Sequence, residues 1–495
     1  MQRITFQSTH ALFNSAATRR IEHAGLAALP PNTLMQRAGL AVAQLAMAVA
    51  PHARTVWIAC GPGNNGGDGL EAALHLHQGG KAVVVTWLGD EARLPADALA
   101  ALGRARAADV PFADTPPAGL TPQDLAIDAL LGLGSSRAPE GRMAAWIAAL
   151  NAGAAPVLAV DLPTGLNADT GATAGEVNTW VHARHTLTFL TLKPGLFTGN
   201  GRDAAGQVWL DTLAVNTAEA PSAVLSGPPD FRPRAHASHK GTFGDVAIIG
   251  GAPGTTGAAL LAGSASLHGG AGRVFVALLG NALQADGAMA LAAAHPELML
   301  RAVDTLDLGR QTVVCGCGGG QLVAAALPRV LAEAPRLVLD ADALNAVAGD
   351  AALQAQLRHR GAGRPTVLTP HPLEAARLLG VPTAEIQADR LSAARQLAER
   401  FQCVVVLKGS GSVIAAPNAA PRINPTGNAR LATAGTGDVL AGLTGALLAG
   451  GHPAFEVACD AVYLHGQAAN AWPTETSLTA GALAAALGAA PHRSK

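Results

Sequence analysis

The feature that most constrains the fold is a regular alternation of short runs rich in Val and Ile with longer segments rich in Ala. In the first half the short runs are TVWIAC, AVVVTWL, LAIDALL, PVLAVDL and HTLTFL, and in the second half they are DVAIIGG, RVFVALL, TVVCGCG, RLVLDAD, TVLTP and CVVVLKG. Such runs predict strands, and the Ala-rich segments between them predict helices. Strands that alternate with helices favour a parallel sheet covered on both faces. We therefore expect an α/β fold in both halves.

The two halves are separated by a segment without periodicity, LAVNTAEAPSAVLSGPPDFRPRAHASHKG, which is rich in Pro, Ser and Ala and typical of an inter-domain connection. A chain of 495 residues is also too long for one ordinary core. The second half does not repeat the first. We expect two different α/β domains, residues 1–222 and 228–492.

Composition excludes several classes of partner. Lys and Arg number 34 against 35 Asp and Glu, so there is no basic excess to bind a nucleic-acid backbone, and no polybasic block favours a membrane surface. No stretch reaches about 18 uninterrupted apolar residues, and the N-terminus lacks the apolar core of a signal peptide. We expect a cytoplasmic protein that binds neither nucleic acid nor membrane.

The cysteines indicate the same compartment. Their number, five, is odd, and most of them lie in apolar runs, as expected for reduced, buried thiols. Cys315 and Cys317 are spaced C-x-C, but no second pair and no nearby histidine completes a zinc set, so we do not expect a zinc site there.

A glycine-rich loop, GPGNNGGDGLEAA (61–73), follows the first strand of the first half and opens a helix. Such folds bind anionic ligands at this place. The spacing of Gly61, Gly63 and Gly66 matches G-x-G-x-x-G, with Asp90 beyond the next strand, which is also found in nicotinamide-dependent dehydrogenases. A plain turn that needs positive φ is another reading. Neither reading requires the polar side chains of the NNGGD segment.

Two further strands of the first half end in polar residues. Asp128 ends one and is followed by a flexible loop from Gly132 to Ala138; Asp161 ends another and is followed by Thr164. Either carboxylate alone is equally well explained as a helix cap. Because parallel strands end at one edge of a sheet, we expect these side chains to converge with Asn65.

The motifs GNNGGDGL, DALLGLG and VDLPTGLNADTG, together with LMQRAG and TLTFLTLKPGL, resemble the NAD(P)H-hydrate epimerase family over about the first 215 residues. The resemblance implies a Rossmann-like three-layer fold, a potassium ion near Asn65, Asp128 and Thr164, and Asp161 as the catalytic residue. Thr164 stands where the family usually has serine, and it keeps the hydroxyl. The residues that the resemblance implies for binding of the hydrated nucleotide are Asn64, Asn65, Gly66, Gly67, Asp68, Gly132, Leu133, Gly134, Ser135, Ser136, Arg137, Ala138 and Asp161.

The chemistry of an epimerase is consistent with one carboxylate. The hydrated nicotinamide carries a hydroxyl beside a ring nitrogen, so its carbon can epimerise if the hydroxyl or the ring bond leaves and returns. This step needs one group that gives and takes a proton, and a carboxylate at the edge of a cleft can do both.

In the second half, LATAGTGDVLAGLTGALLAGG opens a helix at Gly435–Asp438. Exposed N–H groups and the helix dipole favour an anion there. Asp438 would repel a phosphate, but it is well placed as a base for an attacking hydroxyl; an ordinary helix cap is the alternative. Upstream, VVVLKGSGSVIAAP supplies Lys408 and a Gly/Ser loop suited to phosphates and adenine. No G-x-x-x-x-G-K-[ST] motif occurs, which excludes a P-loop NTPase.

GTGD resembles the anion hole of the ribokinase-like superfamily. With HKGTFGDVAIIGG, GAALLAGSASLHGGAG, LDADALN and TPHPLEAARLLG, it resembles the ADP-dependent NAD(P)H-hydrate dehydratases from His239 almost to the C-terminus. The resemblance implies a ribokinase-like fold that uses ADP with Mg²⁺. The implied ADP/AMP-binding residues are Lys408, Gly409, Ser410, Gly411, Ser412 and Gly437, and the implied substrate-binding residues are Ala258, Gly316, Gly318, His371 and Asp438.

Three points in this half stay open. CGCGGG replaces the family's GPGLG and Ala434 replaces a glycine, which leaves the substrate-binding glycine undecided. His371 taken alone is a loop histidine, although the prolines on either side fix its backbone. Asp340 and Asp342 fit either helix caps or a magnesium environment.

Together the two resemblances imply a bifunctional repair enzyme. It would epimerise the R and S forms of hydrated NADH and NADPH, and dehydrate the S form at the expense of ADP, giving AMP and phosphate. We expect it to form a homo-oligomer. The alternatives are a nicotinamide-dependent dehydrogenase, a ribokinase-type small-molecule kinase fused to a nucleotide-binding module, and a non-enzymatic scaffold.

Overall fold

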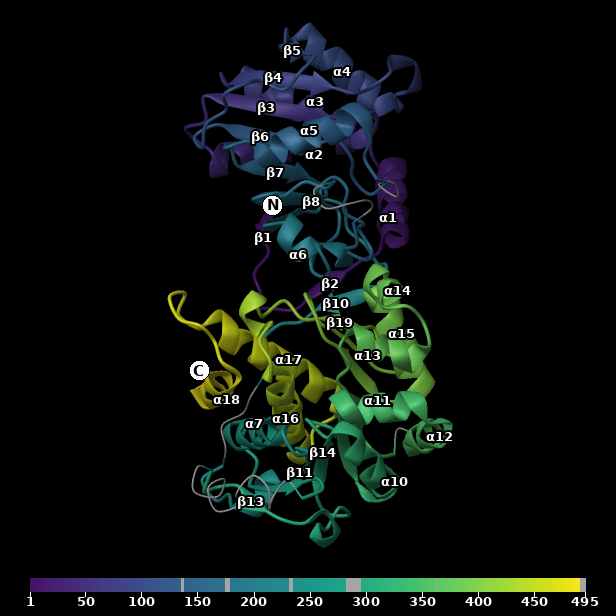
Figure 1. Cartoon of the computed structure of the whole chain (residues 1–495). Helices are drawn as coiled ribbons and strands as arrows, with labels where there is room; N and C mark the ends of the chain where they lie inside the picture. Colours follow the sequence, from purple (N-terminus) through teal and green to yellow (C-terminus); the bar gives the residue numbers. More distant parts are fainter. Residues whose placement is uncertain (135–137, 174–178, 231–234, 282–294, 362, 490–495) are drawn as a thin grey trace. The chain divides into compact units, whose positions relative to one another are not determined.

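The computed structural model describes the chain except for residues 135–137, 174–178, 231–234, 282–294, 362 and 490–495 (Figure 1). It divides into two compact units. The first comprises Met1–Thr5 and His10–Val224, and the second comprises Phe6–Thr9 and Leu225–Lys495. The short segment Phe6–Thr9 therefore belongs to the unit that follows it by more than two hundred residues.

The first unit alternates strands and helices as its sequence predicts. Its elements are β1 (Gln2–Arg3), β2 (His10–Leu12), α1 (Ser15–Ala28), α2 (Thr33–Val49), β3 (Thr55–Cys60), α3 (Asn64–Gln78), β4 (Ala82–Trp87), η1 (Glu91–Arg93), α4 (Ala96–Ala107), β5 (Phe112–Ala113), β6 (Leu125–Ala129), α5 (Gly141–Ala152), β7 (Val157–Val160), β8 (His185–Phe189), η2 (Pro194–Leu196), α6 (Gly201–Ala204) and β9 (Gln207–Asp211); β10 (Ala223–Leu225) reaches the boundary between the units.

The first sheet has the order β1-β9-β8-β7-β6-β3-β4-β5 and is parallel except at β1. Alternate residues of β3 pack on opposite faces, as the pleat requires. Val56 and Ile58 pack in the cluster that contains α2, α3 and α4, whereas Trp57 packs with Trp146 and Ile147 of α5. The expected three-layer arrangement of helices on both faces is therefore confirmed.

The start of α2 differs in detail from a standard capped helix. The helix begins at Thr33, with Asn32 in the N-cap position. The Asn32 side chain makes no capping hydrogen bond, because its backbone is left-handed, with φ of 66°. Asn32 therefore contributes a turn rather than a side-chain cap.

The second unit contains the longer alternating series. Its elements are η3 (Lys240–Phe243), β11 (Asp245–Gly250), α7 (Thr256–His268), β12 (Arg273–Leu278), β13 (Met299–Leu300), η4 (Val303–Thr305), β14 (Thr312–Cys315), η5 (Gly320–Leu322), α10 (Val323–Glu333), β15 (Arg336–Leu339), α11 (Ala341–Gly349), α12 (Ala351–Arg360), β16 (Thr366–Leu368), α13 (Pro372–Leu379), α14 (Thr383–Ala388), α15 (Arg390–Phe401), β17 (Val404–Leu407), β18 (Val413–Ala415), β19 (Arg422–Ile423), η6 (Ala429–Leu431), α16 (Thr436–Ala449), α17 (Ala454–Asn470), α18 (Ala480–Ala486) and η7 (Leu487–Ala489).

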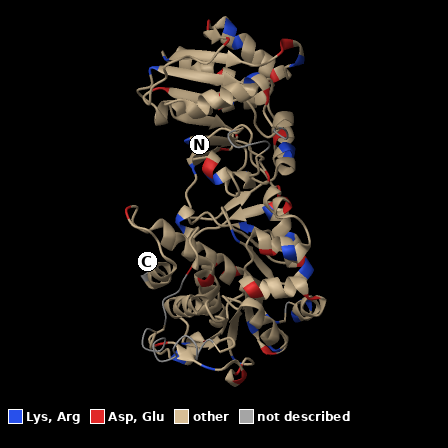
Figure 2. Cartoon of the chain, in the orientation of Figure 1, with Lys and Arg blue, Asp and Glu red and all other residues tan. Residues whose placement is uncertain are grey.

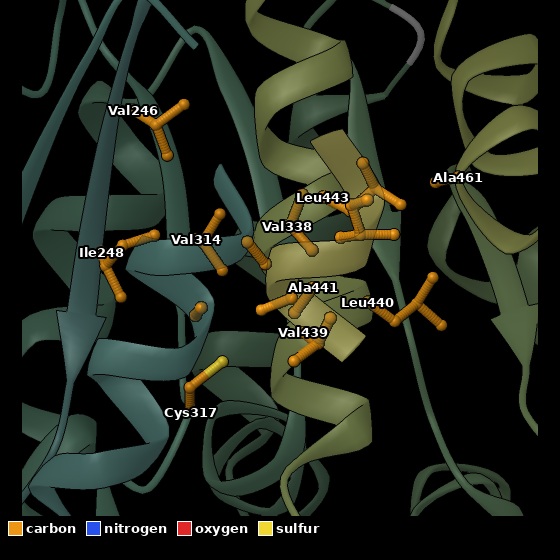
Figure 3. Close-up of a cluster of buried hydrophobic side chains, with 14 of the residues drawn as sticks. Val246, Ile248, Val314, Cys317, Val338, Val439, Leu440, Ala441, Leu443 and Ala461 are labelled. Atoms are coloured by element: carbon orange, nitrogen blue, oxygen red, sulfur yellow. The ribbon is translucent and has the colours of Figure 1, made fainter. Parts of the chain in front are cut away.

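The sheet of the second unit runs in the order β13-β12-β11-β14-β15-β16-β17-β18-β19, parallel as far as β17 and antiparallel beyond it. On one face, Val246, Ile248 and Val314 pack against Val439 and Leu443 of α16 in a buried hydrophobic cluster (Figure 3). The cluster also includes residues of α7 and α17. Helices α10 to α15 lie on the other side of the sheet in Figure 1. This unit is also an α/β sandwich.

Two features of the molecule are the apolar length of its helices and the distribution of its charged residues. Among the described residues, no helix has the length and apolar character needed to cross a membrane. Acidic and basic residues are interspersed over each unit in Figure 2.

Candidate active sites

A cavity of about 340 Å³ lies in the first unit at the carboxyl ends of β3 and β6. This is the point where the strand order diverges, since β4 lies on one side of β3 and β6 on the other. Ligands of open α/β sheets bind at such points. Seven of the predicted residues line the cavity: Asn64, Asn65, Asp68, Gly132, Leu133, Gly134 and Asp161.

The other glycines of the loop serve packing. A Cβ on Gly61 would overlap the carbonyl oxygen of Leu130, and a Cβ on Gly66 would overlap the carbonyl oxygen of Gly61. Gly67 is buried against Met35 of α2. Gly66 and Gly67 therefore let the start of α3 approach its neighbours, and they are not among the residues that line the cavity.

Asp161 is held by one carboxylate oxygen. Its Oδ1 accepts hydrogen bonds from Lys193 Nζ at 2.6 Å and Thr188 Oγ1 at 3.2 Å. Its Oδ2 lies 3.1 Å from the position that a Cβ on Gly132 would take. Since Gly132 lines the cavity and has no side chain, Oδ2 is left facing a space that a ligand can enter.

Lys193 was not identified from the sequence as a site residue. It is fully buried, and besides Asp161 it donates to Thr188 Oγ1 and to the carbonyl oxygen of Phe189, both at 2.8 Å. A buried ammonium is stable only when paired and hydrogen-bonded, and these three acceptors meet that need. Lys193 belongs to TLKPGL, a motif that the sequence analysis used only for the family resemblance.

Two more carboxyl groups line the cavity and are shifted towards their neutral forms. Burial, followed by the charges of Asp161 and Glu22, raises the pKa of Asp68 well above its ordinary value. Burial and the charge of Asp161 likewise raise the pKa of Glu22, which lies on α1. Like charges that share a cavity disfavour ionisation, so Asp68 can donate a hydrogen bond where Asp161 accepts one.

Asp128 and Thr164 are joined directly. Asp128 Oδ1 accepts from the Thr164 hydroxyl at 2.7 Å, and Oδ2 accepts from the Thr164 backbone N–H at 2.8 Å. Burial raises the pKa of Asp128 to about 6. Within the described residues no Lys or Arg pairs with this carboxylate, and the buried Nδ2 of Asn65 has no hydrogen-bond partner. A buried carboxylate without an ion pair, in contact with a hydroxyl group, offers oxygen atoms of the kind that suit a hard cation.

The rest of the predicted loop contributes less. Ser135, Ser136 and Arg137 lie outside the described residues. Ala138 is described and half-buried, but it is not among the residues that line the cavity.

The predicted site residues of the second unit also lie at the carboxyl ends of parallel strands. Cys315 of β14 lies opposite Ile249 of β11 and Leu339 of β15, so the three strands end level with one another. The strand order diverges between β11 and β14, because β12 lies on the far side of β11. The loops after β11, β14, β15, β16 and β17 therefore share one edge of the sheet, as ligand sites of such folds do.

Asp438 lies in the first turn of α16, and Gly435 before it is the N-cap, with φ of 89°. Its carboxylate, the Cys317 thiol and the Asp340 carboxylate offer oxygen and sulfur atoms that all lie within 4.8 Å of one another. Lys408 Nζ donates to Asp340 Oδ1 at 2.8 Å and lies 3.3 Å from the place of a Cβ on Gly437. The predicted Lys408, Gly437 and Asp438 are thus brought together.

Charge and burial set the protonation of this cluster. Burial, then the charge of Asp340, raises the pKa of Asp438 to about 7, against the lowering effects of Cys317 and Lys408. Burial on its own would lower the pKa of Lys408, but Asp340 and Glu374 raise it above its ordinary value. Lys408 therefore stays charged, and Asp438 is a carboxyl poised to take a proton near neutral pH.

The remaining predicted substrate residues differ in position. Gly318 has φ of 59°, and a Cβ on it would lie 2.8 Å from the Cβ of Ala258, so these two residues face each other across the loops. Gly316 lies with its Cα against Asp340 and Ala343. His371 is the N-cap of α13, where its Nδ1 accepts from the Glu374 N–H at 3.0 Å. His371 is half-exposed, so its ring edge stays accessible while its backbone is fixed.

The loop after β17 rests on a buried arginine that the sequence analysis did not identify. Arg390 donates to the carbonyl oxygens of Leu407 at 3.2 Å and Lys408 at 3.0 Å. A Cβ on Gly409 would lie 2.7 Å from the Arg390 guanidinium. Ser412 Oγ donates to the carbonyl oxygen of Gly409 at 3.1 Å, which closes the loop on itself.

The two aspartates left open in the sequence now have partners. Asp340 is at the N-cap of α11 but makes no capping bond, and it accepts from Thr369 Oγ1 as well as from Lys408. Asp342 accepts from the backbone N–H of Gly320 at 2.8 Å. The carboxylates of Asp340 and Asp342 thus both accept hydrogen bonds from groups of the protein.

Known proteins match both halves of the chain. A family model described as YjeF-related protein N-terminus matches residues 31–195, and one described as NAD(P)H-hydrate dehydratase matches residues 246–490. The chain is 39% identical to the bifunctional NAD(P)H-hydrate repair enzyme of Escherichia coli K12 over 460 residues, which cover 88% of this chain and 84% of that protein.

Two further matches each cover about half of the chain. Over 267 residues the chain is 43% identical to the ADP-dependent (S)-NAD(P)H-hydrate dehydratase of Neisseria meningitidis serogroup B, covering 52% of this chain and 88% of that protein. A solved structure, the ADP/ATP-dependent NAD(P)H-hydrate dehydratase of Bacillus subtilis co-crystallised with ATP and Mg²⁺, is 31% identical, with a TM-score of 0.45, and covers 53% of this chain and 93% of that one.

Proposed function

The chain belongs to the family of bifunctional NAD(P)H-hydrate repair enzymes, and we propose that each of its units carries one of the two reactions. The first, with expected bounds 1–222, epimerises the R and S forms of hydrated NADH and NADPH. The second, with expected bounds 228–492, dehydrates the S form with ADP, giving AMP and phosphate. The main support is that each unit has one carboxylate, the buried Asp161 or the partly buried Asp438, at the edge of its own sheet where the strand order diverges.

In the first unit, Asp161 is the proposed proton-transfer group. If the ring opens, Asp161 Oδ2 takes the hydroxyl proton, a carbonyl forms as the carbon–nitrogen bond breaks, and the proton passes to the nitrogen. Closure on the other face reverses these steps. If the hydroxyl leaves instead, the same carboxyl protonates it and later removes a proton from the returning water. Lys193 holds Asp161 Oδ1 throughout, so that Oδ2 keeps its orientation towards the substrate.

The potassium ion fits the residues of this site. Asn65, Asp128 and Thr164 would hold it through oxygen atoms, and it would supply positive charge beside the buried Asp128 carboxylate. The burial of the Asp128 carboxylate, with no Lys or Arg paired to it among the described residues, supports this assignment. Asn64, Asp68 and the loop from Gly132 would bind the hydrated nucleotide.

In the second unit, Asp438 is the proposed base. It takes the proton of the substrate hydroxyl, whose oxygen attacks the terminal phosphorus of ADP while the bond to AMP breaks. Departure of phosphate and loss of a proton from the neighbouring ring carbon restore the ring double bond. Lys408 and the N–H groups around Gly437 would bind the phosphates, which carry Mg²⁺ with them to neutralise charge.

The remaining ligand contacts of the second unit are proposed from the positions of the residues in the fold. Gly409–Ser412 would hold the adenine nucleotide on the loop braced by Arg390, and Ala258, Gly316, Gly318 and His371 would face the hydrate. The cytoplasm is the proposed compartment, in keeping with five free, buried cysteines. A homo-oligomer stays a prediction, which light scattering after size exclusion tests.

The experiment is to incubate the protein with mixed hydrate epimers, ADP and Mg²⁺ and to follow the return of reduced cofactor. Complete conversion of both epimers, with AMP and phosphate formed in step, is expected. A stable phosphorylated product would instead favour the ribokinase-type kinase. Conversion at an undiminished rate in nucleotide-free, chelated buffer would contradict the proposed role of ADP.

A further inference from the structure

Cys317 is a buried thiol at the edge of the dehydratase site. It follows β14 in the loop where the family motif has proline, and its side chain is fully buried. Figure 3 shows it beside the start of α16, on the side of Val439, the residue after Asp438. The proposed mechanism assigns this sulfur no role.

The sequence alone indicated no zinc site at Cys317, because the groups that the fold brings to its sulfur, Asp340 and Asp438, are distant in sequence; these groups are of the kinds that bind metals. Cys317 Sγ and carboxylate oxygens of Asp340 and Asp438 lie within 4.8 Å of one another. They come from three separate segments: the loop after β14, the end of β15 and the start of α16. In a tetrahedral zinc site, bonds of about 2.3 Å to sulfur and about 2.1 Å to oxygen place ligand atoms about 3.6 Å apart. To bind such an ion, the three atoms would have to move closer by up to about 1.2 Å.

One carboxylate oxygen of Asp340 is open to a ligand, and the Asp438 carboxylate is hydrogen-bonded to the Cys317 thiol. Asp340 Oδ1 is bound by Lys408 and Thr369, but Oδ2 lies 4.0 Å from where a Cβ on Gly437 would be, so the missing side chain keeps this side open. Among the described residues, Asp438 makes no ion pair with a Lys or Arg.

We propose that Cys317, Asp340 and Asp438 form a site for a thiophilic divalent cation such as Zn²⁺, whose binding blocks dehydration. The thiol proton is released to solvent as the sulfur–zinc bond forms. With Lys408 charged and both carboxylates ionised, this brings the local net charge from minus one to zero. A fourth position stays open for water or a nucleotide phosphate.

The sulfur gives the site its selectivity. Thiolate favours Zn²⁺ over Mg²⁺, which takes oxygen ligands and keeps its waters. Zn²⁺ would therefore bind at this site, while the nucleotide would still require Mg²⁺. The bound Zn²⁺ would occupy the Asp438 carboxylate oxygen that accepts the substrate proton. The inhibition rests on the proposed function of Asp438, whereas the binding does not.

The test uses the full-length protein without nucleotide. Zn²⁺ affinity is measured by competition with a chromophoric chelator, and Co²⁺ is added separately to look for thiolate-to-cobalt charge-transfer absorption. Since even outer-shell partners change metal affinity by about 10–100-fold, Cys317→Ser should weaken Zn²⁺ binding by at least ~100-fold and abolish the absorption band. Cys403→Ser, another buried thiol of the same unit, should leave both unchanged.

Asp438→Asn provides a second variant that keeps the thiol, and it should also weaken Zn²⁺ binding. Zn²⁺ binding of equal strength in Cys317→Ser and in the wild type would overturn the proposal, as would absence of the cobalt–thiolate band. Cys317-dependent binding that leaves hydrate conversion unaffected would support the metal site and contradict the role proposed for Asp438.

Discussion

Asp161 has a backbone φ of 63°, in the left-handed region that few side chains adopt. A residue held there costs of order 1–3 kcal/mol, unless a short polar side chain eases it. Its N–H donates to the carbonyl oxygen of Leu187 at 2.7 Å, and Lys193 fixes the side chain. The surrounding structure thus imposes the conformation, which is common at functional sites.

Replacing Lys193 by methionine should slow epimerisation. Methionine keeps the length but removes the charge that holds Asp161 Oδ1, so the rate should fall by at most the ~10²–10⁴ expected for loss of the proton-transfer group itself. Breaking a buried ion pair also costs roughly 3–5 kcal/mol, so the first unit should melt earlier. Epimer exchange by NMR and a thermal melt measure the two effects. Dehydration of the S epimer is the control, and an unchanged exchange rate would contradict the positioning role.

The pKa of Asp438 predicts how dehydration depends on pH. The groups that face it are Asp340 and Asp342, which raise its pKa, and Cys317 and Lys408, which lower it. As a base it must be ionised, so kcat/KM should rise with pH and level off above about 7. Lys408→Met should move this inflection upward, although it also weakens nucleotide binding. A flat profile through neutrality would exclude Asp438 as the base.

The same shift has a consequence for stability. The folded pKa of Asp438, about 7, exceeds the ordinary value of 3.8. The folded state therefore keeps a proton that the unfolded chain releases near pH 4. Its contribution favours folding below that pH and is lost as the pH rises through 7. At a pH where Asp438 is ionised and can act as a base, it therefore no longer contributes this stability to the folded state. Groups with shifted pKa values are common at active sites.

Site residues differed in how well the sequence indicated them. Asp161 and Asp438 stand in short polar motifs at strand or helix ends, which parallel topology places at one edge. Lys193 lies in an otherwise apolar stretch, and Arg390 begins a helix far from the loop that it supports. Their roles depend on tertiary burial beside particular carbonyl or carboxylate groups. Such tertiary partners cannot be predicted from the local sequence around Lys193 or Arg390.

At the level of elements, the start of α3 depends on glycine at defined positions. Gly66→Ala should destabilise the first unit by about 1–3 kcal/mol, because the new methyl would overlap the carbonyl oxygen of Gly61. Gly63→Ala is the matched control, since nothing lies within 4 Å of a Cβ there. Urea unfolding measures both. Equal stability of the two variants would show that the close approach is not needed.

The first residue of α16, Thr436, is held by a histidine of α17. His465 is buried, and its Nε2 lies 2.9 Å from the carbonyl oxygen of Thr436, so Nε2 carries the proton and donates. Burial lowers its pKa to about 4. The stabilising effect is full above the unfolded value of 6.5 and is lost as the pH falls towards 4.

The second unit should therefore lose a few kcal/mol of stability between pH 6.5 and 4 through this residue, at 1.36 kcal/mol per pKa unit. His465→Gln removes the titrating group but keeps a donor. The variant should show a smaller drop in urea midpoint between these pH values than the wild type. The same drop in both proteins would mean that other groups cause the acid sensitivity.

Strands were predictable in proportion to their burial. β3, β11 and β17 are apolar on both faces and read as continuous runs, so composition and length were sufficient. The edge strand β1 has two residues, too few to show any period. Pairing with β9, which is distant in sequence, defines it.

On the scale of the whole molecule, the division of the chain is not linear. Phe6–Thr9 belong to the second unit, where the Tyr463 hydroxyl donates to the carbonyl oxygen of Phe6 at 2.9 Å. A fragment that starts near Pro229 would lose this segment and would expose what it covers. Composition can locate a linker, but it cannot show that an N-terminal segment returns to another unit. Separate functions are therefore best tested within the full-length chain.

Two near-isosteric substitutions separate the sites. Asp438→Asn should abolish nucleotide-dependent repair, with a loss of ~10²–10⁴ in rate, while epimers still interconvert. Asp161→Asn should do the reverse: the S epimer is consumed at the normal rate, and the R epimer is left to interconvert at the uncatalysed rate. Thermal melts check folding, and chiral separation of the hydrates with absorbance of the reduced cofactor follows each reaction. If both folded variants lost both activities, one shared site would replace the two-site proposal. If each lost only its own, the chain would need both carboxylates because either activity alone leaves one epimer unrepaired.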